Sequence, residues 1–315
     1  MPSARIGIVS WNTADLLGRC LDSLVAATEG LDADIVVVDN ASSDDSATVA
    51  EQRHGVRVIR NSENLGYAKA MNQALLDGGD VSKYDALIAF NPDAEAPARS
   101  ITVLVERLLA DPRAGLVVPR LVNTDGSLQH SAYRFPSVAV TAAVGFVPRR
   151  VLARGLGDRM GLEGHSPHDT AGYVDWAIGA VHVIRTSALD GQPPYNERWF
   201  MYVEDLDLCW QLHERGWLCR FEPSVEITHV GNAAGSQAWG AARSKRWWGA
   251  TYDWYELRHG RGAARRWAAI NLAAVAAKTA RPGLKRVARR EIAPWEQDLI
   301  NVVPLHAAAV LGRPT

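Results

Sequence analysis

One carboxylate at the end of a predicted strand is placed where it could do chemistry. In "LIAFNPDAEA" (Leu87–Ala96) an apolar run stops at Asn91-Pro92-Asp93. Because proline has no N–H for a strand ladder, Pro92 predicts that the strand ends there and that Asp93 stands on a rigid corner. An acid held on a rigid corner at the end of a buried strand calls for a functional explanation.

A histidine far along the chain is a candidate partner for this acid. His229 follows the strand-like "VEIT" and precedes Gly231. A lone histidine is more often a structural hydrogen-bonding group than a metal ligand, and that interpretation stays open. If His229 lies near Asp93, one carboxylate oxygen and one imidazole, completed by two phosphate oxygens and water, suit Mg²⁺ or Mn²⁺.

A second group of acids lies in "FMYVEDLDLCWQL" (Phe200–Leu212), where Glu204, Asp205 and Asp207 follow four apolar residues. A carboxylate at the edge of an apolar pocket can have a raised pKa and act as a general base. Acids in the first turn of a helix also interact favourably with the helix dipole, and that simpler interpretation stays open.

These residues need a scaffold, and the first third of the chain predicts one. Short β-branched runs alternate with segments of helical spacing, which implies βαβ units, an α/β fold and a mainly parallel central sheet flanked by helices. The predicted strands are Arg5–Trp11, Ala33–Ser42, Val56–Asn61 and the run before Asp93, and the predicted helices are Thr13–Thr28, Ser42–His54 and Gly66–Gly78.

Polar residues follow three of these strands. Asp39 and Asn40 end the second strand, Asn61 to Asn64 follow the third, and Asp93 follows the fourth. Ligands of such sheets bind beyond the carboxyl ends of the strands, so these residues are expected at one binding edge. Any one of them could be a simple turn former, because Asn and Asp are common in loops.

The pattern loosens after Ala114. Residues 115–137 predict a strand, a turn at Asp125-Gly126 and another strand, and residues 138–170, rich in Gly, Pro and Arg, predict a mobile loop. Residues 174–189 predict a strand and a short helix. A helix is expected from about Glu204, and a strand over residues 218–231 that ends at His229.

The totals exclude several classes of protein. The chain has 315 residues, 47% of them hydrophobic and 22% charged, with a formal net charge of -1, so the whole chain is not a polyanion binder. Three cysteines (Cys20, Cys209 and Cys219) without a C-x-x-C indicate neither a disulfide framework nor a zinc site, and favour a reducing, cytosolic setting. We expect neither a signal peptide nor a membrane span, because the longest apolar candidate, Trp267–Ala277, is too short.

The C-terminal part differs in composition. Residues 258–290 contain ten Arg or Lys and no Asp or Glu, and they follow an aromatic and basic segment, Trp239–Gly260. At helical spacing Trp248, Tyr252 and Tyr255 share a face, which either packs on the rest of the protein or serves a lipid-linked acceptor at a membrane interface. A nucleic-acid-binding tail is less favoured, because no base-recognition motif is present.

Five segments in order then carry a resemblance: "VVDNASSDDS", "NSENLGYAKAMNQAL", "AFNPDA", "WFMYVEDLDLCWQLHERGW" and "THVG". The chain resembles the family 2 glycosyltransferases over roughly residues 5 to 260, and within them it is most similar to the rhamnosyltransferase-like branch. The resemblance implies a GT-A fold over residues 1–257, with residues 258–315 as a helical extension that could associate with a membrane.

The resemblance also implies roles for individual residues. Asp39 would recognise the base of the nucleotide-sugar, Asp93 and His229 would hold the metal, and Asp205, with Glu204 beside it, would be the catalytic base. The other donor-binding residues would be Trp11, Asn12, Asn64, Gly66, Asn72 and Asn91. The family motif has Asp where this chain has Asn91, which could still bind a ribose but removes one formal charge from the site.

The implied activity is inverting transfer of a sugar, with L-rhamnose from dTDP-rhamnose as first choice, to a lipid-linked or polysaccharide acceptor in cell-envelope glycan synthesis. The expected place is the cytoplasmic face of the cell membrane; no oligomeric state is indicated. A UDP- or GDP-sugar donor with a glycolipid acceptor, and a silent glycan- or lipid-binding scaffold, remain alternatives. A nucleotidyltransferase is disfavoured, because "VSWNTADLL" has neither the Gly nor the Lys of a triphosphate loop.

Overall fold

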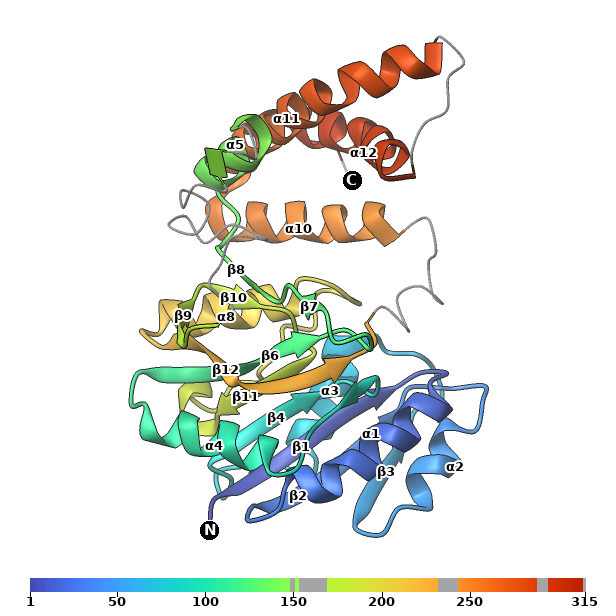
Figure 1. The fold of residues 1–315 in the computed structure, drawn as a ribbon, viewed down its shortest axis with the longest axis vertical. Helices are drawn as coiled ribbons and strands as arrows, with labels where there is room; N and C mark the ends of the chain where they lie inside the picture. The colour runs from blue at the N-terminus through green and yellow to red at the C-terminus, as the bar shows by residue number, and fades with distance from the viewer. Residues whose placement is uncertain (148–150, 153–168, 232–242, 288–293, 314–315) are drawn as a thin grey trace. The chain divides into compact units, whose positions relative to one another are not determined.

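A computed structural model describes residues 1–147, 151–152, 169–231, 243–287 and 294–313, with only the backbone for residues 280–287 and 294–299 (Figure 1). The chain divides into two compact units. Unit 1 comprises Met1–Tyr133 and Pro167–Ala238, and unit 2 comprises Arg134–Ser166 and Trp239–Thr315. The boundary at residue 257 stays a prediction about which segment folds by itself, and the contacts group the helix before that position with unit 2.

The first part of unit 1 alternates strands and helices, as the sequence predicts. Its elements are β1 (Ser3–Ser10), α1 (Ala14–Ala27), β2 (Asp32–Asp39), α2 (Ser46–Glu51), β3 (Val56–Arg60), α3 (Tyr67–Leu76) and β4 (Ala86–Phe90). The second part is β5 (Ala94–Glu95), α4 (Ser100–Ala110), β6 (Ala114–Val122), β7 (Leu128–Gln129), β8 (Ala132–Tyr133), β9 (Gly172–Val174), β10 (Trp176–Ala177), β11 (Val181–Arg185), the 3₁₀ helix η2 (Thr186–Leu189), α8 (Glu204–Glu214) and β12 (Leu218–His229).

A mixed, mainly parallel sheet forms the centre of unit 1. Among the described residues it has ten strands, with the order β3-β2-β1-β4-β11-β6-β12-β5 and with β7 and β9 at its side. The pairs β1–β2, β1–β4, β2–β3 and β6–β12 are parallel, whereas β11 runs antiparallel between β4 and β6. The predicted fold class is therefore confirmed.

Side-chain alternation on β1 decides which helix covers which face of the sheet. Ile6 and Ile8 belong to the core cluster that also contains side chains of α1 and α4. Gly7 lies between them and faces the opposite side of the sheet, where an added Cβ would lie 2.9 Å from the Leu75 side chain of α3. Buried on both faces, β1 is a continuous apolar run, as expected of a parallel strand in an α/β protein.

Unit 2 is helical in the described residues, with α5 (Val138–Phe146), α10 (Arg243–His259), α11 (Arg261–Val287) and α12 (Pro294–Val310). The prediction of a mobile loop over residues 138–170 was wrong for α5. Ser137 caps this helix by accepting a hydrogen bond from the Val140 backbone N–H, and α5 packs against α11. Residues 153–168 of that predicted loop lie outside the described residues.

The aromatic face predicted on α10 exists, and it is buried within unit 2. Trp248 stacks on Tyr252 with ring centroids 5.8 Å apart, and Tyr255 stacks on Trp267 of α11 at 4.4 Å. His306 of α12 hydrogen-bonds the Tyr252 hydroxyl over 2.8 Å. These rings therefore form the core of the helical unit. No helix in the described part of the chain is both long enough and apolar enough to cross a membrane.

One backbone contact in unit 1 fixes the loop that precedes α8. The Tyr67 N–H donates to the Phe200 carbonyl over 2.8 Å, and Gly66 has a φ of +83°. A Cβ on Gly66 would lie 2.3 Å from the Phe200 oxygen. Only glycine gives both this dihedral and this close approach without strain.

We expect Gly66→Ala to lower the free energy of unfolding by more than ~2 kcal/mol, because it adds a backbone clash to the left-handed strain. Gly55→Ala is the matched control: φ is +79° there, but nothing lies within 4 Å of the added Cβ. It should cost only about 1 kcal/mol. Urea unfolding of both variants measures the difference, and equal losses would contradict the importance of the Phe200 contact.

Candidate active site

Two strand ends bring Asp93 and His229 together. Asp93 follows β4, His229 is the last residue of β12, and the two segments pair through β5, where His229 lies opposite Ala94. The Val230 N–H also donates to the Asp93 carbonyl over 3.0 Å. Asp93 Oδ1 then lies 3.2 Å from His229 Nε2, with both residues about 6% exposed.

Gln129 of β7 sets the tautomer of this histidine. Its amide nitrogen donates to Asn123 Oδ1 over 3.2 Å and to the His229 carbonyl over 3.4 Å, so its oxygen faces His229 Nδ1 at 2.7 Å. Nδ1 must therefore carry a proton. In the neutral ring the Nε2 lone pair then points at the Asp93 carboxylate, an arrangement that a cation between the two atoms would stabilise.

The electrostatics of Asp93 fit the same role. Burial opposes its ionisation, but a His229 ring that carries a proton on both nitrogens donates to the carboxylate from Nε2, and this hydrogen bond and its charge hold the pKa of Asp93 below its usual value. A divalent cation between Asp93 Oδ1 and His229 Nε2 would take the place of that proton. Two cis ligands of an octahedral ion, each at ~2.1 Å, are ~3.0 Å apart, close to the observed separation of the two side chains. The pair therefore fits a divalent cation.

The protein supplies only part of a coordination shell. In the described residues no group of three or more His, Cys, Asp or Glu side chains is arranged to hold a metal. Asn91, at the position where the family has an acid, donates from Nδ2 to His229 Nε2 over 3.2 Å. Asp93 and His229 would be two ligands, and the remaining positions would be open to phosphate oxygens and water.

Tyr67, which the sequence analysis did not single out, connects this corner to the second group of acids. Its hydroxyl lies 3.3 Å from Asn91 Oδ1 and 3.2 Å from the Gly179 carbonyl. The Gly179 N–H in turn donates to Asp205 Oδ2 over 3.1 Å. Burial, and then the charges of Glu204, Asp205 and Asp93, raise the pKa of Tyr67 well above its usual value. All three acids are thus close enough to act on one hydroxyl.

Asp205 and Glu204 begin α8 after a strained turn. Tyr202 and Val203 have φ of +75° and +63°, an unfavourable conformation for side-chain-bearing residues that costs ~1–3 kcal/mol each. Burial raises the pKa of Asp205 to about 6. Burial, and then the charge of Asp205, raise the pKa of Glu204 to about 8. Of the two, Asp205 is only half-buried, so it is the accessible carboxylate.

The predicted donor-binding residues gather at the carboxyl ends of β1 and β2. Asp39 is 5% exposed, and its Oδ1 has no hydrogen-bond partner in the described structure, while Oδ2 accepts from the Ser42 N–H over 3.3 Å. Asn12 has a φ of +53° and accepts from the Ser43 N–H over 2.7 Å, which ties the end of β1 to this turn. Trp11 is half-buried directly after β1.

Asn40, which the sequence places at the binding edge without a specific role, organises the neighbouring loop. Its amide oxygen accepts from Asn61 Nδ2 and the Leu65 N–H, both over 3.0 Å. Its amide nitrogen donates to Asn64 Oδ1 over 2.9 Å, and Asn64 Oδ1 also accepts from the Gly66 N–H. Asn64 and Gly66 are thus held beside the end of β2.

Asn72 occupies a different position from the one expected of a pocket-lining residue. It is 3% exposed, and its amide exchanges hydrogen bonds with the Tyr195 backbone at 2.8 and 3.1 Å and donates to Glu197 Oε1 at 3.0 Å. These bonds hold the loop before α8. Its predicted contact with the nucleotide stays a prediction.

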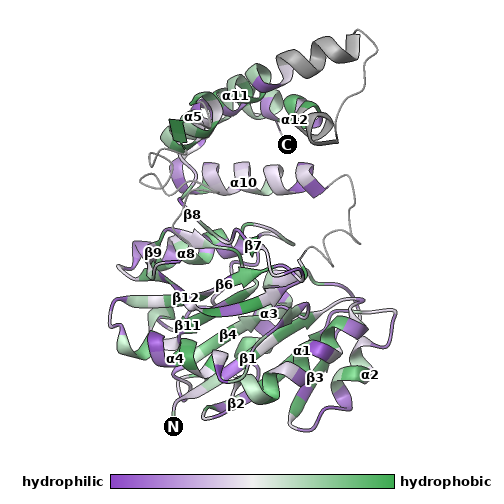
Figure 2. Cartoon of the chain, in the orientation of Figure 1, coloured by the Kyte–Doolittle hydropathy of each residue, from purple (hydrophilic) through white to green (hydrophobic). Residues whose placement is uncertain are grey.

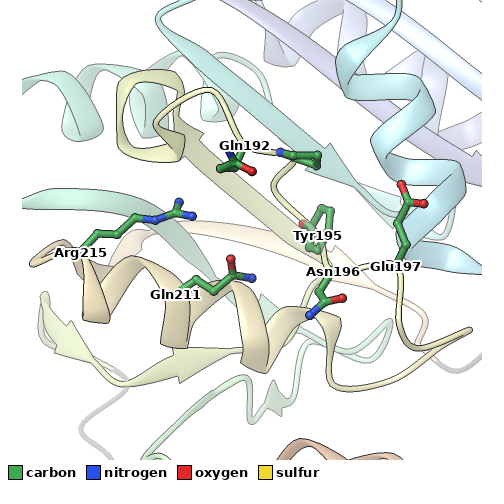
Figure 3. Close-up of a pocket in the computed structure, with 7 residues that line it drawn as sticks. Gln192, Tyr195, Asn196, Glu197, Gln211 and Arg215 are labelled. Carbon is green, nitrogen blue, oxygen red and sulfur yellow. The ribbon is translucent and has the colours of Figure 1, made fainter. Parts of the chain in front are cut away.

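A polar hollow of about 280 Å³ lies beside this loop (Figure 3). Gln211 and Arg215 of α8 line one side and the loop lines the other; the full lining is Gln192, Pro193, Tyr195, Asn196, Glu197, Gln211 and Arg215. Gln211 and Asn196 both donate to Asp207, which is fully buried. Asp207, the third acid of the sequence motif, therefore supports the loop.

Comparison with known proteins agrees with this geometry. The glycosyl transferase family 2 model matches residues 6–158. The chain is 32% identical over 233 residues to "N-acetylglucosaminyl-diphospho-decaprenol L-rhamnosyltransferase" of Mycobacterium tuberculosis, covering 70% of this chain and 74% of the relative. It is 21% identical over 221 residues to "Poly-beta-1,6-N-acetyl-D-glucosamine synthase" of Staphylococcus aureus, covering 69% of this chain and 47% of that protein.

Solved structures show the same fold. The mannosyltransferase PcManGT from Pyrobaculum calidifontis, in complex with GDP-Man and Mn²⁺, aligns with a TM-score of 0.57 over 98% of this chain and 86% of that one, at 18% identity. GalNAc-T7 with UDP, GalNAc and Mn²⁺ aligns with a TM-score of 0.52 over 73% of this chain and 44% of that one, at 16% identity. The fold and these relatives define a glycosyltransferase of the GT-A class. The chain belongs to glycosyltransferase family 2, which confirms the resemblance inferred from its motifs.

The buried pair at the start of α8 makes stability depend on pH. The pKa of Glu204 in the folded protein is above its ordinary value of 4.5, so its contribution to stability is complete below that value and is lost as pH rises toward about 8. We expect Glu204→Gln to match the wild type near pH 4.5 and to be more stable by ~1–3 kcal/mol near pH 8.5. Urea unfolding at both pH values measures this, with Glu63→Gln as an exposed control. A constant difference between Glu204→Gln and the wild type across this range would contradict the burial argument.

Proposed function

We propose that the protein is an inverting, metal-dependent glycosyltransferase that moves a sugar from a nucleoside-diphosphate donor to a hydroxyl of a lipid-linked acceptor. L-rhamnose from dTDP-rhamnose is the first candidate donor, because the mycobacterial relative is named as a rhamnosyltransferase acting on N-acetylglucosaminyl-diphospho-decaprenol. A UDP- or GDP-sugar is the alternative. The proposed setting is cell-envelope glycan synthesis at the cytoplasmic face of the membrane.

One observation carries the proposal. A continuous series of contacts runs from His229 and Asn91 through the Tyr67 hydroxyl to Gly179 and Asp205. The metal-binding corner and the second carboxylate therefore belong to one site, on two sides of one tyrosine. Sugar transfer with inversion needs those two functions, one for the leaving diphosphate and one for the attacking hydroxyl.

The residues divide between the two halves of the reaction. Asp93 and His229 would hold Mg²⁺ or Mn²⁺, which supplies Lewis-acid stabilisation of charge on the departing diphosphate. Asp205, with its pKa raised to about 6 by burial, would accept the proton of the acceptor hydroxyl near neutral pH. Glu204 is buried beside Asp205, and burial followed by the charge of Asp205 raises its pKa to about 8, so Asp205 is the carboxylate that ionises first.

Asp39 would bind the donor base. Its Oδ1 is buried without a hydrogen-bond partner in the described structure, and a buried acceptor of this kind gains most from a ligand N–H. The imide N–H of thymine or uracil is such a donor. Guanine also has an N–H that can donate to a carboxylate, so this geometry supports a donor whose base carries a ring N–H, and the donor screen decides among dTDP-, UDP- and GDP-sugars.

The first test is a donor screen by thermal shift and slow donor hydrolysis, with dTDP-rhamnose, UDP-sugars and GDP-sugars in Mg²⁺ or Mn²⁺. One donor should raise the unfolding midpoint in a metal-dependent manner, and Asp93→Ala should abolish that stabilisation.

Gln129→Leu should weaken Mn²⁺ affinity ~10–100-fold in the presence of the nucleoside diphosphate, because His229 loses the partner that fixes its tautomer.

Gln129→Glu keeps an acceptor opposite His229 Nδ1 and should retain most of the Mn²⁺ affinity, which electron paramagnetic resonance measures directly. A wild-type protein that responds to none of these donors would overturn the proposal. So would an Asp93→Ala protein that keeps the metal-dependent shift.

The base assignment predicts a pH profile. The rate constant kcat/KM should fall as pH drops through about 6, where Asp205 becomes protonated. Asp205→Asn should lower kcat by ~10²–10⁴-fold with little change in donor affinity. Asp207→Asn, two residues further along α8, is the control and should keep the acid limb of the profile. Loss of that limb in Asp207→Asn, or its persistence in Asp205→Asn, would contradict the assignment.

A further inference from the structure

The two units of the chain carry opposite charge. Unit 2 contains 19 Arg or Lys and seven Asp or Glu, a formal net charge of +12. Because the whole chain has a net charge of -1, unit 1 carries -13. A charge difference of this size between two parts of one chain indicates that the basic part faces an anionic partner.

The aromatic segment expected to meet a membrane offers one exposed ring in its described part, Trp247 at 37%, whereas its other described rings are buried or half-buried within unit 2. Tyr252, Trp254, Tyr255 and Trp267 are all less than 10% exposed within unit 2. Their rings stack on one another and on His306 through α10, α11 and α12. Interface-seeking aromatic side chains have to be exposed to reach a bilayer, so another element has to supply most of the apolar contact.

Among the described residues, helix α5 exposes three large apolar side chains of unit 2 within nine residues, whereas Trp247, Leu257 and Leu311 are exposed singly. The stretch Phe135–Val147 contains no charged residue, and the helix is coloured as strongly hydrophobic in Figure 2. Val138, Val144 and Phe146 are 39%, 45% and 50% exposed. Val138, Ala142 and Phe146 are spaced i, i+4, i+8, so they share one side of the helix.

Two other parts of the α5 surface are packed within unit 2: Ala143, with Val140 and Val147, clusters with Leu152, and the flank that carries Thr141 and Gly145 contacts α11. The Trp267 indole N–H donates to Thr141 Oγ1 over 2.8 Å. A Cβ added to Gly145 would lie 2.5 Å from the Ala274 Cβ, so the two helices touch there. The exposed side chains are therefore presented from a supported helix.

Cationic side chains lie on the elements that hold α5. The exposed Lys278 of α11 donates to the Val144 carbonyl at the C-terminal end of α5 over 3.2 Å. Other exposed basic residues of unit 2 are Arg134, Lys245, Arg246, Arg261, Arg265 and Arg266. A short apolar helix alone anchors a protein only marginally, and a polybasic surface beside it supplies the second signal.

We propose that α5 and the basic residues of unit 2 form a docking surface for an anionic lipid bilayer, with Val138, Ala142 and Phe146 entering the headgroup region. Charge complementarity selects this partner, because the unit is strongly cationic and its exposed apolar side is uncharged. The proposal rests on the proposed function only for its biological purpose, which is to bring a lipid-linked acceptor to the enzyme.

Vesicle flotation of the full-length protein tests the proposal. We expect binding to phosphatidylglycerol-containing vesicles that is at least tenfold tighter than binding to pure phosphatidylcholine vesicles and that weakens as salt rises. Phe146→Asp should weaken binding at least tenfold, because it places a charge in the headgroup region. Val25→Asp, at a 78% exposed position in unit 1, is the matched control and should bind like the wild type.

A second measurement reports the position of α5 directly. The three native cysteines are buried, so an environment-sensitive dye can be attached selectively to Phe146→Cys or to Val25→Cys. The dye at position 146 should shift to shorter emission wavelength on adding anionic vesicles, and the dye at position 25 should not. Vesicle binding without a shift at position 146, or no binding by the wild type, would overturn the proposal.

Two further outcomes separate this inference from its rivals. A vesicle-free wild-type dimer that Phe146→Asp converts to a monomer would overturn the bilayer as partner and assign the apolar side to a second copy of the chain. Donor hydrolysis by Phe146→Asp should equal that of the wild type. If the wild type hydrolyses no donor but still docks through α5, the proposed function fails and the docking surface stands.

Discussion

The close approach of Asp93 and His229 is the constraint on which the site depends. The two residues come from β4 and β12, 136 positions apart in the chain, and they meet because β12 pairs with the short strand β5 directly after Asp93. Pro92 ends β4 at that point, so the chain can turn and offer β5 to a strand from another part of the sheet. Gln129 then fixes the imidazole from β7, which pairs with β6. A carboxylate and an imidazole lone pair face each other as a result, and that arrangement favours a cation.

Neutral amides hold the remaining loops of the site. Asn40 secures the turn that contains Asn64 and Gly66, and Asn72 secures the loop before α8. Carboxylates in these places would add negative charge beside a donor that already carries a diphosphate. An amide side chain offers both a hydrogen-bond donor and an acceptor and adds no negative charge. The amides therefore position the loops, and Asp93 and Asp205 carry the negative charge. The left-handed turn at Tyr202 and Val203 is held in the same way, by the loop that Asn72 and Gly66 anchor.

Much of unit 1 could be predicted from its sequence, because local signals and tertiary structure agree there. The strand runs, the stop at Pro92 and the start of α8 at Glu204 all lie where periodicity and proline chemistry indicate. Gln129 and Tyr67 were missed for a physical reason: their roles come from pairing between distant strands, which leaves no local pattern. The loop prediction failed over Val138–Phe146 because α5 is stabilised by packing on α11, more than 100 residues away, and by its Ser137 cap.

The separation of charge between the units follows from the chemistry of each. Unit 1 has a formal net charge of -13, and a net charge far from zero opposes self-association. Unit 2 builds its core from aromatic rings instead of a sheet, so its cationic residues are free of any catalytic constraint and can be concentrated on helix surfaces. A short uncharged helix would be a liability on an acidic surface, because nothing would direct it to a bilayer before it met another copy of the chain. On a cationic unit the same helix has an electrostatically selected partner, and the apolar contact adds to an attraction that already exists at long range.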